Sequence, residues 1–130
     1  MTNPIQVNQM DHIVLVTRDK AAMLAFYCDV LGLSIDRDRP ELGLTHIRCG
    51  PQMIDLIVRT TPRPAREAHN QDHFALQVRP FDETAIRAHL AAHGIEIAEE
   101  GARYGADGVG FSLYIRDPEG NLVELKGPSV

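Results

Sequence analysis

An internal repeat constrains the fold of this chain more than any other feature of its sequence. The segment Asp11–Leu15, DHIVL, recurs as Asp72–Leu76, DHFAL. In both halves a stretch with helical periodicity follows and ends in glycine. Repeats of this kind mark copies of one supersecondary unit, so the sequence predicts two related modules, about 8–60 and about 70–127. The segment 59–71, which is rich in proline and charge, is expected to link them.

Each module has the pattern of one strand, one helix and then further strands. Alternating polarity is typical of strands, because successive side chains point to opposite faces. Aspartate is a favoured N-cap and glycine commonly ends a helix, which sets the expected helix bounds. The expected elements are strands at 10–17 and 72–79, helices at Asp19–Gly32 and Asp82–Gly94, and two hairpins, 44–49 with 53–58 and 111–116 with 121–126.

Each module also carries a histidine near its start and a carboxylate near its end. His12 and His73 lie in the repeated segment, and Asp55 and Glu124 lie in the last strand of each half. In these last strands the acids alternate with apolar residues that suit a core, so the acids point to the opposite, helix-free face. The histidines can share that face. If the two sheets curl toward each other, all four side chains converge on one cavity.

Composition indicates one globular domain, residues 1–130, and excludes several partners. Hydrophobic residues make up 44% and charged residues 24%, which is usual for a single domain. The net charge of −5 offers no basic surface to nucleic acid or to an anionic membrane, and no apolar run has membrane-spanning length. Cys28 and Cys49 form neither a disulfide framework nor a metal-binding Cys-x-x-Cys pair. Since residues 1–10 lack a signal pattern, we expect a cytoplasmic protein.

Four segments carry a wider resemblance that extends from about Met10 to Lys126. The last of them contains the run Asp-Pro-Glu-Gly-Asn-x-x-Glu, which is the most specific part. Together they resemble the glyoxalase/bleomycin-resistance/dioxygenase family, also called the vicinal oxygen chelate superfamily. The four segments are Asp11–Val16, Phe26–Leu33, Asp72–Val78 and Ser112–Leu125.

The resemblance implies an α+β fold, in which two tandem βαβββ modules form a half-barrel cavity around a divalent metal. It places His12, His73 and Glu124 at metal-ligand positions. Asp55 stands where glyoxalase I enzymes usually carry a ligating glutamate; it is one methylene shorter, and it is a fourth candidate ligand. Tyr114 lies where fosfomycin-resistance enzymes have a substrate-contacting tyrosine. Many relatives are homodimers, so a homodimer is expected here.

The residue types themselves indicate what such a site would do. Two imidazoles with one or two carboxylates suit Zn, Ni, Mn, Co or Fe rather than Cu(I). Open coordination positions would take neighbouring oxygens of a substrate, and the metal would act as a Lewis acid. Glu124 is the candidate general base. For one histidine alone a structural hydrogen bond is the simpler interpretation, but the duplicated His and acid positions favour a metal site.

Two further features remain open between a functional and a structural interpretation. His46 and Arg48 share one face of strand 44–49, and they either bind an anionic substrate or line an edge of the sheet. The glycines between 101 and 110 indicate a loop, which is either a flap over the cavity or an ordinary surface loop.

The favoured function is a metal-dependent lyase or isomerase of the glyoxalase type, acting on a small molecule with vicinal oxygens. An Fe(II) dioxygenase is the first alternative, because two histidines and one carboxylate match the non-haem iron pattern. A thiol-dependent antibiotic-resistance transferase would share the three-ligand site. A metal-free drug-binding protein, as in bleomycin resistance, belongs to another class, and the conspicuous ligand set argues against it.

Overall fold

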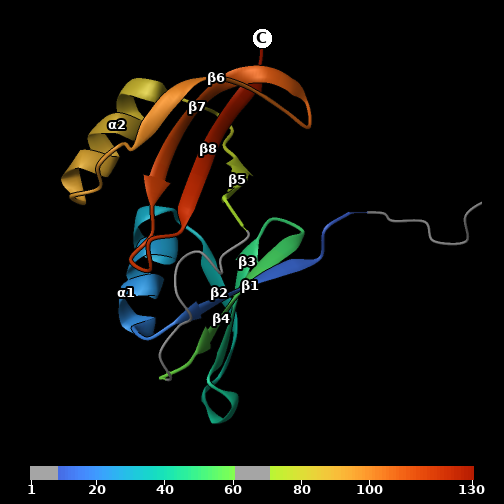
Figure 1. Cartoon of the computed structure of the whole chain (residues 1–130), viewed down its shortest axis with the longest axis vertical. Coiled ribbons are helices and arrows are strands. Elements are labelled where there is room, and N and C mark those ends of the chain that lie inside the picture. The colour runs from blue at the N-terminus through green and yellow to red at the C-terminus, as the bar shows by residue number, and fades with distance from the viewer. Residues whose placement is uncertain (1–8, 61–70) are drawn as a thin grey trace, which may run out of the picture. The chain divides into compact units, whose positions relative to one another are not determined.

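The computed structural model describes residues 9–60 and 71–130 of the chain. The chain divides into two compact units, Met1–Thr60 and Thr61–Val130, and each is described by itself. Figure 1 shows their elements, coloured along the chain. Of the expected linker 59–71, residues 61–70 lie outside the described residues. Within the described residues, no helix is long and apolar enough to cross a membrane.

Unit 1 contains one four-stranded sheet with the strand order β1-β4-β3-β2. Strand β1 is parallel to β4, and the other neighbours are antiparallel. The helical segments between β1 and β2 make the connection that this parallel pair requires. The elements are β1 (His12–Thr17), α1 (Lys20–Leu24), η1 (Ala25–Val30), β2 (Ser34–Arg39), η2 (Pro40–Leu42), β3 (Leu44–Cys49) and β4 (Gln52–Val58).

Unit 2 repeats this arrangement with the strand order β5-β8-β7-β6. Its first strand, β5, is parallel to its last, β8, and the other neighbours are again antiparallel. Its elements are β5 (His73–Gln77), α2 (Glu83–Ala92), β6 (Glu99–Gly105), β7 (Gly108–Arg116) and β8 (Leu122–Ser129). The predicted α+β class and the two tandem βαβββ modules are therefore confirmed.

The buried apolar side chains follow the alternation expected for the last strands. Ile54 and Leu56 flank Asp55 in β4, and Val123 and Leu125 flank Glu124 in β8; all four apolar side chains are at most 4% exposed. Strand β7 contributes further core residues, and the helices add the largest ones. The remaining core side chains are Leu15, Met23, Phe26, Tyr27, Ile47, Leu90, Leu113, Tyr114 and Ile115.

The first helical segment begins as expected but changes its hydrogen bonding halfway. The Asp19 carboxylate caps α1 by accepting a hydrogen bond from the backbone N–H of Ala22, at 3.0 Å. From Ala25 the backbone is a π-helix, and Leu31 N–H donates to the carbonyl of Phe26, five residues earlier. The wider turn carries Phe26 and Tyr27, both buried, into the core. The prediction of one uniform α-helix to Gly32 was therefore wrong in its second half.

The glycine-rich stretch 101–110 is not a loop, so the loop prediction was wrong. It forms most of strand β6, a tight turn and the start of strand β7. Glycine in a strand allows another backbone to come close. A Cβ atom at Gly110 would lie 2.4 Å from the carbonyl oxygen of Pro128 in β8. The glycine thus permits β7 and β8 to approach each other, and it does not make the segment a flap.

Candidate functional site

In unit 1, the predicted ligands His12 and Asp55 lie next to each other on the sheet. Asp55 is only 5% exposed although it is a carboxylate, and its Oδ2 is 3.8 Å from Nε2 of His12. His46 on β3 is directly opposite Asp55 on β4. Its Nδ1 is 2.8 Å from Oδ1 of Asp55. The register of the sheet therefore gathers two imidazoles around one buried carboxylate.

In unit 2, His73 and Glu124 form the corresponding pair, with a shorter distance. Glu124 is also 5% exposed, and its Oε1 is 3.2 Å from Nε2 of His73. Its other oxygen, Oε2, accepts a hydrogen bond of 2.7 Å from the hydroxyl of Ser112 on β7. Ser112 holds one carboxylate oxygen in place, and the other oxygen faces the histidine.

Each of the two histidines has the aspartate that precedes it in the sequence as a second partner. Nδ1 of His12 lies 2.7 Å from the carboxylate of Asp11, and Nδ1 of His73 lies 2.7 Å from that of Asp72. The hydrogen bond with Asp11 raises the pKa of His12, and the charge of Asp55 adds to this effect. A carboxylate on one ring nitrogen orients the imidazole and leaves the other nitrogen, Nε2, to act as a ligand. Metal-binding histidines typically have this arrangement.

The two pairs belong to different units of the chain. Over residues 9–60 and 71–130, no three His, Cys, Asp or Glu side chains form a group that could hold a metal ion. The four-residue ligand set His12, Asp55, His73 and Glu124 therefore stays a prediction. Each unit contributes one histidine and one buried carboxylate to it.

Tyr114, the predicted substrate-contacting residue, lies beside the unit 2 pair. Its ring is 5.4 Å from that of His73 in an edge-on arrangement, measured between ring centroids. Burial raises the pKa of its hydroxyl, and the hydrogen bond with Glu124 raises it further. The guanidinium of Arg103 opposes this rise, and its Cζ is 5.3 Å from the centre of the tyrosine ring. At neutral pH the hydroxyl is protonated and can donate a hydrogen bond.

The other predicted substrate residue, Arg48, has a different setting from His46. Its guanidinium lies 3.2 Å from the carboxylate of Asp36 on β2, and both side chains are more than two-fifths exposed.

Cys28 and Cys49 are free thiols, and burial raises the pKa of both. A raised pKa reduces the thiolate fraction, so neither is an activated nucleophile.

Sequence reasoning gave no role to three residues that lie around the unit 2 pair. They are Arg103 on β6, Ser112 on β7 and Lys126 on β8. Ser112 on β7 is directly opposite Lys126 on β8, as Tyr114 is opposite Glu124. Directly paired residues share a face of the sheet. The alternation of β8 was the available signal, since Lys126 follows Glu124 by two residues.

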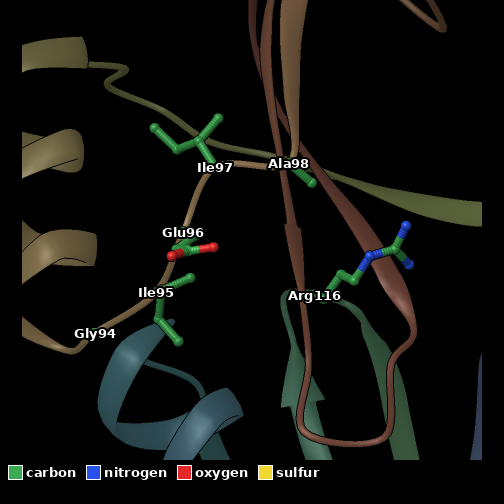
Figure 2. A pocket seen from close by; sticks show the side chains of 6 residues that line it. All are labelled: Gly94, Ile95, Glu96, Ile97, Ala98 and Arg116. Atoms are coloured by element: carbon green, nitrogen blue, oxygen red, sulfur yellow. The ribbon is translucent and has the colours of Figure 1, made fainter.

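A pocket of about 340 Å³ lies elsewhere in unit 2 (Figure 2). It is lined by the segment 94–98, which joins α2 to β6, and by Arg116 at the end of β7. In Figure 2 the guanidinium of Arg116 points away from this segment, and its Nη1 donates a hydrogen bond to the carbonyl of Gly120. The pocket does not contain the predicted ligands, so we do not place the chemistry there.

Comparison with known sequences identifies the family. A model of the Glyoxalase/Bleomycin resistance protein/Dioxygenase superfamily matches residues 9–125. The virulence protein STM3117 of Salmonella typhimurium is 30% identical over 126 residues, which cover 92% of this chain and 83% of that protein. The catechol-2,3-dioxygenase of Bacillus subtilis is 27% identical over 130 residues, which cover 96% of this chain but only 43% of the dioxygenase.

Solved structures share the fold over nearly the whole chain. The Salmonella typhimurium virulence protein has a TM-score of 0.78 with 27% identity, covering 95% of this chain and 99% of that one. Lactoylglutathione lyase from Agrobacterium tumefaciens has a TM-score of 0.70 with 28% identity, covering 94% and 95%. The fosfomycin resistance protein FosX from Listeria monocytogenes has a TM-score of 0.75 with 19% identity, covering 96% and 94%, and it is similar in fold alone.

Proposed function

The chain belongs to the glyoxalase/bleomycin resistance protein/dioxygenase superfamily, and we propose that it is a metal-dependent lyase or isomerase that acts on a small molecule with vicinal oxygens. The observation that carries this proposal is the duplicated ligand geometry. Each unit pairs a buried carboxylate with a histidine whose Nδ1 is held by the preceding aspartate. The preceding aspartate orients each imidazole and leaves its Nε2 to act as a ligand.

The proposed ligands are His12, His73 and Glu124, with Asp55 as a fourth. Their donor atoms fit a borderline divalent cation, namely Zn, Ni, Mn, Co or Fe, because imidazole nitrogen and carboxylate oxygen together suit such ions. The two buried carboxylates also support a cation site, since buried anions need a compensating charge. When bound, the metal would polarise the oxygens of the substrate as a Lewis acid.

Glu124 is the proposed general base. Ser112 donates a hydrogen bond to its Oε2 and so fixes the orientation of the carboxylate. Oε1, which lies 3.2 Å from Nε2 of His73, would take a proton from the substrate carbon next to a carbonyl group. The Tyr114 hydroxyl, whose pKa is raised chiefly by burial, stays protonated and would donate a hydrogen bond to a substrate oxygen. Arg103, above the tyrosine ring, positions Tyr114.

Asp55 has a more crowded setting than Glu124 and is the weakest of the proposed ligands. One of its oxygens is 2.8 Å from His46, and the other is 3.8 Å from Nε2 of His12. His46 would therefore hold Asp55 in place, as Ser112 holds Glu124. This gives His46 a supporting role in the proposal rather than a direct contact with the substrate.

An Fe(II) dioxygenase is the second candidate. Two histidines and one carboxylate form the facial triad of non-haem iron oxygenases, and a matched relative is the catechol-2,3-dioxygenase of Bacillus subtilis. The chain spans less than half of that relative, so this activity ranks second. Oxygen uptake in the presence of Fe(II) and catechol would indicate the dioxygenase. Turnover of a 2-oxoaldehyde thiol adduct without oxygen uptake would indicate the lyase or isomerase.

Metal analysis tests the proposal directly. Protein purified without chelator is expected to hold nearly one divalent metal per chain, and His12→Ala, His73→Ala and Glu124→Ala are each expected to lose it. His93→Ala, which removes an exposed histidine of the second helical region, is the matched control and should keep the metal. A parent protein that takes up none of Zn, Ni, Mn, Co or Fe(II) would contradict the proposal.

We further propose that the protein is cytoplasmic, that it forms a homodimer, and that it binds a small-molecule substrate. Light scattering after size exclusion should then give about twice the chain mass of 14.4 kDa. Mixing His12→Ala with His73→Ala protein tests how the ligand sets combine. Recovery of metal in the mixture would mean that the ligands come from two chains, and no recovery would mean that one chain supplies them all.

A further inference from the structure

Lys126 on β8 is a buried cation without a hydrogen bond. The residue is 7% exposed. Among the buried side-chain nitrogens and oxygens that the structure describes, its Nζ has no hydrogen-bond partner. Burying an ammonium group costs a large amount of free energy unless it is paired. An unpaired buried ammonium group therefore either only destabilises the fold or is available to bind a ligand.

The acids near Lys126 on this face are already bound to other groups. The carboxylate of Glu124 contacts Ser112 and His73. Asp107, in the turn after β6, accepts hydrogen bonds from Arg79 at 2.6 Å and from Gln77 at 3.0 Å. Arg79 is the chief cause of the lowered pKa of Asp107, and Lys126 contributes a smaller Coulombic part. The ammonium group of Lys126 thus interacts with the Asp107 charge through space but does not form a hydrogen bond with it.

The fold makes specific room for the lysine side chain. A Cβ atom at Gly105, at the end of β6, would lie 2.4 Å from Cε of Lys126, so the aliphatic stem lies directly over the glycine. Lys126 is also directly opposite Ser112 in the register of β7 and β8. Lys126 therefore shares the face that carries Glu124, Ser112 and Tyr114, and its side chain leads from there toward the turn between β6 and β7.

We propose that Lys126 determines specificity by binding an anionic oxygen group of the substrate, a carboxylate, phosphate or phosphonate. The inference rests on the proposed function, because it assumes that the vicinal oxygens of the substrate lie at Glu124. A carboxylate or phosphate oxygen would supply the charge-assisted hydrogen bond that the ammonium lacks. A neutral substrate would leave the buried charge unpaired, so the site would discriminate against it.

The two lysines of the chain make a direct test possible. The chain contains only Lys20 and Lys126, so protein grown with [ε-¹³C]lysine gives two ε-methylene signals in a carbon–proton correlation spectrum. Lys20 is on α1, with its ammonium 2.9 Å from Asp38, and it is the internal control. Lys20→Met assigns the two signals.

The probes are lactate and inorganic phosphate, which are anions, and 1,2-propanediol, which has the vicinal oxygens of lactate without its charge. Titration with lactate or phosphate is expected to shift the Lys126 signal in a saturable way and to leave the Lys20 signal unchanged, whereas 1,2-propanediol should shift neither. The relative affinity for lactate and phosphate then distinguishes a carboxylate from a phosphate-type substrate. A Lys126 signal that responds to neither anion overturns the proposal.

Lys126→Met, which keeps the stem but removes the charge, should weaken binding of the responding anion about tenfold to a hundredfold, the usual effect of losing one charge-assisted hydrogen bond. Lys20→Met should bind it as the parent does. Unchanged affinity in Lys126→Met would overturn the inference. Metal content separates the two proposals: Lys126→Met should retain the metal, and a parent that binds lactate at Lys126 but never binds metal would contradict only the enzyme proposal.

Discussion

Single residues on the inner strands carry charges that a protein interior normally excludes. Asp55, Glu124 and Lys126 are all at most 7% exposed. The two carboxylates have histidine neighbours, and Glu124 has the Ser112 hydroxyl as well. Lys126 has no such hydrogen bond among the described residues. Proteins commonly give up stability at functional sites in this way.

This difference predicts a stabilising substitution. Lys126→Met removes a buried unpaired charge and keeps most of the apolar stem, so the free energy of unfolding should rise by roughly 1–3 kcal/mol. Urea denaturation at pH 7 measures it. Lys20→Met removes only an exposed ion pair, and we expect little change there because such pairs contribute little. A less stable Lys126→Met protein would mean that the ammonium supports the fold.

At the scale of elements, the turn between β7 and β8 explains why its sequence run is so specific. Asp117 is 4% exposed, and its Oδ1 accepts hydrogen bonds from the backbone N–H groups of Glu119 and Asn121, both at 2.9 Å. Its Oδ2 accepts one of 2.7 Å from the Asn121 side chain. The turn fixes the register of β7 and β8, and that register places Tyr114 directly opposite Glu124 and Ser112 within hydrogen-bond distance of it. The run is thus partly structural.

Replacing the turn carboxylate should therefore destabilise the protein. Asp117→Ala would leave the donors of Glu119 and Asn121 without their acceptor, and we expect a loss of about 2–4 kcal/mol in the free energy of unfolding. Asp117→Asn keeps one oxygen and should lose less. Glu96→Gln, which changes an exposed carboxylate outside the turn, is the control. Equal stability of all three variants would show that the turn forms without the carboxylate.

The contact between α2 and β6 predicts a dependence on pH. The Arg87 guanidinium lies 2.7 Å from Glu100 and also bonds Glu83. Its hydrogen bond lowers the pKa of Glu100. Because the folded pKa lies below the unfolded one, about 4.3, the contribution to stability is complete above that value and is lost as pH falls through the folded pKa.

The comparison of Glu100→Gln with the parent measures this contribution. The parent should be more stable than Glu100→Gln at pH 6 and low salt, and the difference should disappear toward pH 3 and shrink in high salt. Glu96→Gln changes the same charge at an exposed position and is the control. A difference that persists at pH 3 would assign it to packing instead of charge.

For the whole molecule, metal binding should stabilise the full chain only when both histidine–carboxylate pairs, His12 with Asp55 and His73 with Glu124, are intact. A ligand at about 100 times its dissociation constant adds roughly 2.7 kcal/mol, which for a chain of this size raises Tm by about 5–10 °C. We expect this rise in the parent and in His93→Ala. His12→Ala and His73→Ala should each abolish it. A rise that survives in one of the two would place the metal in a single unit.

Local sequence patterns determined the class of the fold and indicated which residues to propose for the candidate site. The two-residue period of the strands assigns His12, Asp55, His73 and Glu124 to chosen faces, and the aspartate caps at Asp19 and Asp82 fix where the helical segments begin. These properties depend on neighbours within a few residues, so the sequence contains them directly. The internal repeat then predicted the two modules.

Tertiary structure decided what depends on residues far apart in the chain. The glycines of 101–110 are typical of a loop when the sequence is considered alone. Only the pairing of β7 with β8 shows that the close approach of the two strands requires a glycine at position 110. The partners of Glu124, the π-helical turn at Ala25–Val30 and the unpaired Lys126 were likewise not predictable. Each results from strand register and packing, which bring together groups whose sequence separation carries no local signal.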